Sequence, residues 1–228
     1  MYKKVTHTIV EEHFGHPAAH QIKSMLEAPP GHTLPDHLQH LKAVNMQTVF
    51  SFRTAARAAL NKYFWRVRSS LVSILDNAAD QTALQTQLYK DIADLGTSVA
   101  IYYGPTAGTA LDSKLKMYSD SLIDVVKAIR DGKDYAALRT ANSNSITDLA
   151  TFLSSANPTH WPASAVTSIF AELSSRFIEQ AVARKAKDWL ADFAAVDKAQ
   201  QIFMTNPTSF ADVFVNGIVS QFPNKFTS

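Results

Sequence analysis

The stretch from Leu60 to Leu75, LNKYFWRVRSSLVSIL, carries a single apolar stripe that strongly constrains how this chain can fold. The stripe consists of apolar residues three or four positions apart: Leu60, Phe64, Val67, Leu71 and Ile74. This spacing places them on one face of an α-helix, and such a face has to be covered by other elements. We therefore expect a framework helix here, with Arg66 and Arg68 as surface or ion-pairing groups.

Glycine and proline are rare in the rest of the chain, with 7 glycines and 9 prolines among 228 residues. The stretches between them repeat apolar residues with helical spacing, and no strand-like alternation is sustained. Hydrophobic residues make up 46% of the chain and charged residues 18%, which suits a packed core rather than a disordered chain. The sequence predicts an all-α, up-down helical bundle, with two four-helix halves packed together as the expected arrangement.

Breakers such as Gly104-Pro105, Asp131-Gly132 and Asn157-Pro158 mark the expected helix ends. Residues 35–77 fit either one long helix or two helices with a bend near Ser51–Thr54, where Thr54 would be the N-cap. The expected helices span Pro17–Glu27, Pro35–Asn77, Asp80–Tyr103, Ala107–Arg130, Asp134–Ala156, Pro162–Lys187, Trp189–Met204 and Thr208–Gln221.

Two further features concern the second half of the chain. The helix from Trp189 is expected to present Phe193, Val196 and Phe203 on its apolar face, and the aromatic segment Phe222–Phe226 is expected to dock onto the bundle. Trp161, between a histidine and a proline, is interpreted as a residue that packs one helix against the next, and the alternative is a ligand-stacking role.

The chain is expected to divide into two parts. Residues 1–50 form an N-terminal arm rich in His and Pro with short helices, and residues 51–226 form the helical bundle. The pairs Ala93-Asp94 and Ala211-Asp212 each precede a helix that ends in an aromatic residue and a helix breaker. This hint of duplication would give halves 51–131 and 134–226.

Composition excludes several functions. There is no cysteine, which removes disulfides, cysteine-based zinc sites and thiol nucleophiles. The net charge of +2 lacks the dense basic face of a nucleic-acid groove, so no nucleic-acid partner is expected. No apolar run is long enough to span a membrane, and no signal peptide is visible behind the first lysines, so a cytoplasmic location is expected.

Five segments carry a resemblance to a known family: Arg68–Ile74, Tyr102–Gly104, Val125–Ala128, Phe152–Pro158 and Gly217–Phe226. Over about residues 60–226 the chain resembles a family of uncharacterised bacterial all-helical proteins loosely labelled as acetylglutamate kinases or glycosyltransferases. The resemblance implies paired four-helix bundles. It also implies that Tyr63, Tyr118 and Leu173 replace histidines that recur on several helices of the family, so it implies no activity.

Seven of the eight histidines lie in the first 40 residues, and five of them have spacings that place them on shared helix faces: His13, His16, His20, His37 and His40. Neutral imidazoles are common ligands of transition metals, so these five residues are the candidate metal ligands. Against this, Gly15 and Pro17 interrupt a continuous helix. The segment HTLPDHLQHL also resembles the entry to the second helix of DinB-type metal-dependent bundles, with His40 as the matching ligand.

No catalytic motif is found. The segment Gly104–Thr109 lacks the lysine of a phosphate-binding loop and follows a helix rather than a strand. The favoured hypothesis is therefore a non-enzymatic protein that acts through its surface in a structural, self-assembly or binding role, as a homo-oligomer formed through the N-terminal arm and without a cofactor. Two alternatives stay open: a metal-binding four-helix bundle of the DinB or ferritin type, and a carrier of a small apolar ligand.

Overall fold

The computed structural model describes residues 45–206 and 208–227, all within one compact unit that spans residues 44–228. The predicted helix Pro17–Glu27, most of the predicted arm and the five candidate metal ligands lie outside the described residues.

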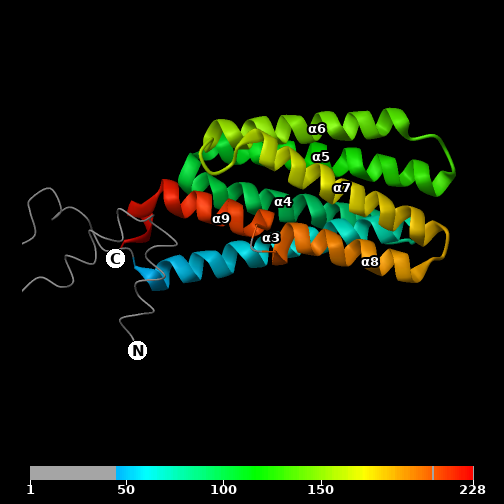
Figure 1. The fold of residues 1–228 in the computed structure, drawn as a ribbon, viewed down its shortest axis with the longest axis horizontal. Helices are drawn as coiled ribbons and strands as arrows, with labels where there is room; N and C mark the ends of the chain where they lie inside the picture. Colours follow the sequence, from blue (N-terminus) through cyan, green and yellow to red (C-terminus); the bar gives the residue numbers. More distant parts are fainter. Residues whose placement is uncertain (1–44, 207, 228) are drawn as a thin grey trace, which may run out of the picture. The chain divides into compact units, whose positions relative to one another are not determined.

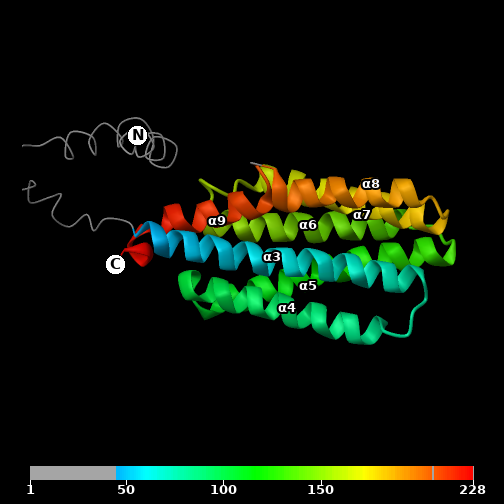
Figure 2. The ribbon, with the colours of Figure 1, turned by 90° about the horizontal axis from the view of Figure 1, so that it is seen from below.

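The described chain is a bundle of long helices whose axes run roughly along one direction (Figures 1 and 2). The α-helices are α3 (Met46–Leu75), α4 (Gln81–Tyr103), α5 (Pro105–Asp131), α6 (Ala136–Ala156), α7 (Ala163–Lys185), α8 (Trp189–Gln200) and α9 (Phe210–Gln221). A short π-helix, Gln201–Thr205, continues α8, and a 3-10 turn, Pro223–Phe226, follows α9.

The predicted all-α bundle is confirmed, and there is no strand in the described residues. Leu60 of α3, Leu122 of α5, Phe170 of α7 and Phe214 of α9 belong to one continuous buried cluster. The predicted division into halves at residues 131–134 stays a prediction, and such halves would share this core. None of the described helices is long and apolar enough to cross a membrane.

Helix α3 is the framework helix expected from the sequence. Asn45 begins it, because its side-chain oxygen accepts hydrogen bonds from the backbone N–H groups of Gln47 and Thr48. Its whole apolar stripe, from Leu60 to Ile74, is buried. The helix continues without interruption through Thr54, so the alternative of a bend with Thr54 as N-cap is wrong, and residues 46–50 are the first residues of this helix.

Helices α4 and α5 form a hairpin that brings two glycines into contact. A Cβ atom at Gly108 would lie 2.5 Å from the carbonyl oxygen of Gly96, and a Cβ at Gly96 would lie 2.6 Å from that of Gly108. Only glycine permits the two backbones to approach this closely. The reversal between the helices uses Gly104 at φ 86°, a left-handed conformation that also favours glycine.

We expect Gly108→Ala to destabilise the protein by about 1–3 kcal/mol, because the added methyl group must push the two helix backbones apart. This cost outweighs the gain of about 1 kcal/mol that alanine normally brings to a helix interior. Urea unfolding followed by circular dichroism measures the change, and Thr109→Ala, at an exposed position of the same helix, is the control. A stabilised Gly108→Ala protein would show that the helices do not cross this closely.

The aromatic side chains form a connected array through the core. Rings at 4.8–5.9 Å centroid distances link Trp161 to Phe214, Phe214 to Phe210, Phe210 to Phe203 and Phe203 to Phe64. The array explains most of the phenylalanine content as core packing. At its end, Phe226 is buried against Phe52 and Tyr102, and the backbone N–H of Asn45 donates a hydrogen bond to the Phe226 carbonyl at 2.7 Å. The predicted docking of the C-terminal segment is therefore confirmed.

Candidate interaction surface

The predicted metal ligands His13, His16, His20, His37 and His40 lie outside the described residues, so the metal-site hypothesis stays a prediction. Among residues 45–206 and 208–227, no group of three or more His, Asp or Glu side chains lies close enough together to bind a metal ion.

Tyr63, Tyr118 and Leu173, which correspond to the histidines of the resembled family, lie close together inside the bundle. The hydroxyl of Tyr63 lies 3.1 Å from that of Ser119, and the hydroxyl of Ser174 donates to that of Tyr118 at 3.1 Å. Ser119 and Ser174 directly follow Tyr118 and Leu173 in the sequence, so the three positions lie in one layer of the core. Burial raises the pKa of both tyrosines. Neutral, hydrogen-bonded phenols in this layer contribute to packing and offer no acid–base chemistry near neutral pH.

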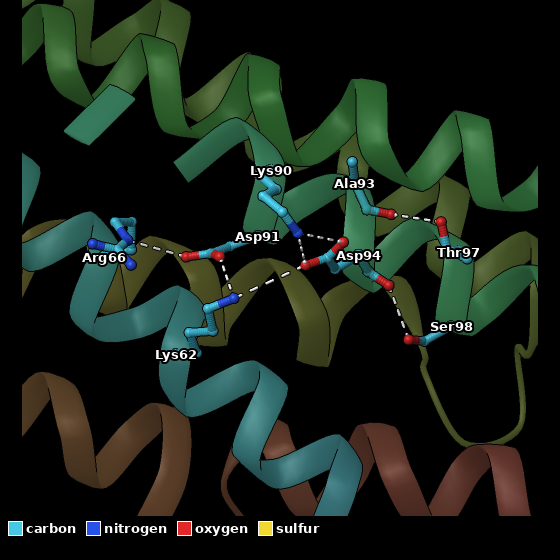
Figure 3. Close-up of polar contacts among 8 residues, drawn as sticks. All are labelled: Lys62, Arg66, Lys90, Asp91, Ala93, Asp94, Thr97 and Ser98. Atoms are coloured by element: carbon cyan, nitrogen blue, oxygen red, sulfur yellow. Dashed lines mark hydrogen bonds and ion pairs between the residues drawn. The ribbon is translucent and has the colours of Figure 1, made fainter. Parts of the chain in front are cut away.

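The most buried carboxylate of α4 joins that helix to α3 (Figure 3). Only 1% of the Asp91 side chain is exposed, and its two oxygens lie 2.6 Å from Nζ of Lys62 and 3.1 Å from Nε of Arg66. Nζ of Lys62 also lies 3.9 Å from Asp94, which pairs with Lys90 at 2.9 Å. The hydrogen bond from Lys90 lowers the pKa of Asp94. Each carboxylate in this cluster is compensated by a cation, so the cluster links helices. The predicted ion-pairing role of Arg66 is confirmed.

Helix α8 presents large apolar side chains to solvent. Trp189, Leu190 and Phe193 are 51%, 85% and 59% exposed, and we call these three residues the α8 apolar face. The adjoining side of the helix, which faces the core, buries Asp192 together with small or medium apolar residues such as Ala195 and Val196. The expectation that Phe193 shares a buried face with Val196 and Phe203 is wrong, because Phe193 points away from the core that the other two enter.

A network of charges fixes the start of α8. Asp188 caps the helix by accepting a hydrogen bond from the N–H of Ala191. Arg184, at the end of α7, pairs with Asp192 at 2.9 Å and with Asp76 at 2.6 Å, and its guanidinium lies 5.5 Å from the centre of the Trp189 ring. These ion pairs raise the pKa of Arg184, with the hydrogen bond to Asp76 as the largest cause. The arginine thereby supports the exposed indole from one side.

Sequence reasoning missed this surface, although a signal was available. In the segment DWLADF, Asp192 lies among four apolar residues, and its i, i+3, i+4 spacing with Trp189 and Phe193 interrupts the apolar face that these two would otherwise form. Which of these side chains is buried depends on which side of the helix faces α7. Asp192 lies on that side, where it pairs with Arg184.

Comparison of the chain with protein-family models, with curated proteins and with solved structures finds no match. The resemblance of residues 60–226 to the uncharacterised bacterial helical family therefore stays a prediction, and the candidate surface has to be interpreted from its own chemistry.

Proposed function

We propose that this protein is a non-enzymatic helical protein that acts by binding another protein chain through the α8 apolar face. The observation that carries the proposal is the inverted burial on α8, where Trp189, Leu190 and Phe193 face solvent and Asp192 faces the core. A helix that served only to cover the core would gain stability by turning Phe193 inward. A cluster of large apolar side chains at the surface is typical of an interaction site.

The composition of the face suits a protein partner. Trp and Arg are enriched among the residues that dominate binding energy at interfaces, and here Arg184 supports Trp189. Two adjacent residues of opposite charge, Lys187 and Asp188, border the face. This balance does not favour the polyanionic surface of a nucleic acid, which selects for clustered cations.

We take the partner to be a second copy of the chain. An apolar face on a single helix can pack against the same face of another copy around a two-fold axis, so that each copy contributes the same residues. The N-terminal arm expected from the sequence is a second candidate contact in such an assembly. In this proposal the protein has a structural or self-assembly role.

The test is the molar mass of the full-length chain, measured by light scattering and by sedimentation over a range of concentrations. We expect a dimer or larger assembly for the native chain, and a monomer with native circular dichroism for the triple variant W189S/L190S/F193S. Single hot-spot truncations at interfaces cost about 2 kcal/mol or more, so Trp189→Ala alone should weaken association by at least about 30-fold.

Met117→Ser is the matched control, because Met117 is an exposed apolar residue on α5, away from the α8 face. This variant should keep the native molar mass. A native chain that is monomeric at every concentration, or a triple variant that keeps the native mass, would overturn the proposal.

A further inference from the structure

We infer that a groove between α3, α4 and α9 is a binding site for a small, uncharged apolar molecule. This inference concerns a different surface from the α8 apolar face and stands independently of the proposed function. The groove has a volume of about 220 Å³. An apolar cavity of about 150 Å³ is large enough to bind benzene, so this one accommodates a molecule up to about the size of a bicyclic aromatic.

Small side chains create the space. Ala55, Ala56 and Ala59 lie on the side of α3 that faces the groove, and Ser98 faces it from α4. Residues three and four apart on a helix share one face, so the alanines form a continuous short-chain strip. Leu or Phe at these positions would fill the gap between the helices, as the apolar residues from Leu60 onward do further along α3.

The floor and walls are built from the core. Leu95 and Val99 of α4, with Phe214 of α9, are buried residues that form the floor. The rings of Phe52 and Tyr102 stand at one end, 5.3 Å apart in an edge-to-face arrangement, and both contact the buried ring of Phe226. Because these rings are held by packing, the site exists without a ligand, and binding does not have to order it.

The charge of the groove selects the class of ligand. Among the residues that the structure describes, none of the side chains that line the groove is charged, and the only side-chain polar atoms in its lining are the hydroxyl groups of Ser98 and Tyr102. The Ser98 hydroxyl already donates to the carbonyl of Asp94 at 2.9 Å. Burial of an ionised ligand here would be uncompensated, whereas an apolar ligand gains the transfer free energy of its surface. The complementary ligand is therefore a neutral aromatic or short aliphatic molecule with at most one polar group.

The test uses 1-naphthylamine, an uncharged bicyclic dye whose fluorescence shifts to shorter wavelength in apolar surroundings, titrated against the full-length folded chain. We expect saturable binding of one dye per chain, and competition by naphthalene. Ala59→Phe should weaken binding by at least about ten-fold, because the added ring occupies the site. Ala55→Phe, at the exposed mouth of the groove, should also weaken dye binding. It replaces Ala59→Phe in the test if that variant lowers the yield of folded protein.

Ala58→Phe is the matched control, because Ala58 is an exposed neighbour on α3 that does not line the groove. It adds the same ring to the same helix and should leave dye binding unchanged. The inference is overturned if the native chain does not bind the dye, which would also be the result if another part of the chain fills the groove. It is equally overturned if Ala55→Phe and Ala59→Phe bind as well as Ala58→Phe.

Discussion

Replacement of both Lys62 and Arg66 by methionine should lower the free energy of unfolding by about 3–5 kcal/mol, the usual cost of removing the partners of a buried charge. The carboxylate of Asp91 is 1% exposed, whereas the side chains of Lys62 and Arg66 are 51% and 29% exposed. When the cations are removed, Asp91 stays in the helix interface without compensation. Methionine preserves much of the apolar stem packing, so the measured loss reports on charge rather than on a cavity.

Removal of the buried charge itself should lower the free energy of unfolding by less. Asp91→Asn removes the buried charge and leaves two cations that already reach water, so their solvation replaces the lost ion pairs. Urea unfolding of both variants measures the difference. Lys90→Met is the control, because Lys90 and its partner Asp94 are both exposed and their ion pair contributes little. A double variant that is no less stable than Asp91→Asn would contradict the assignment of Asp91 as the buried member of the cluster.

Trp161→Ala should destabilise the protein by about 3–5 kcal/mol, the range for truncation of a large buried aromatic residue. The indole is 2% exposed, stacks on Phe214 at 4.8 Å and donates a hydrogen bond from Nε1 to the carbonyl of Val213 at 3.2 Å. It also fills the space above Gly217, where a Cβ would lie 2.3 Å from Nε1. Alanine would leave a cavity at the junction of the α6–α7 connection with α9. The predicted role of Trp161 in packing helices together is therefore confirmed.

Two variants sharpen the interpretation. Trp161→Phe keeps most of the stacking and loses the hydrogen bond, so its cost should lie well below that of alanine. Trp65→Ala removes the same side chain from a position that is 37% exposed, and its effect should be smaller because less apolar surface is lost. Thermal or urea unfolding gives both values. Equal losses for Trp161→Ala and Trp65→Ala would show that Trp161 is not a core residue.

The helix ends were the most predictable part of the structure. The expected ends at Tyr103, Arg130 and Ala156 lie within one residue of the observed ends. Glycine with positive φ at residues 104 and 132 reverses the chain there, and such signals depend only on the nearest neighbours in sequence. The docking of Phe222–Phe226 was predictable for a related reason, because a strongly aromatic segment gains free energy from any apolar surface that it can reach.

The candidate surface and the groove were not predictable in the same way. The sequence placed its candidate site on five N-terminal histidines, all outside the described residues, and it assigned Phe193 to the core. Whether a helix turns Phe193 or Asp192 inward depends on Arg184 of another helix, and whether Ala55 and Ala59 leave a groove depends on what lies opposite them on α4 and α9.

The sequence by itself therefore determined an all-helical chain, its helix ends and the buried stripe of α3, because these follow from spacing and local backbone preference. Only the tertiary structure decided which helix faces are covered. It buried Asp91 between two cations, brought Tyr63 and Tyr118 into one layer, and left the α8 apolar face and the alanine-lined groove open to solvent. The physical reason is that burial and compensation of charge are properties of pairs of helices, and no single helix carries that information in its own periodicity.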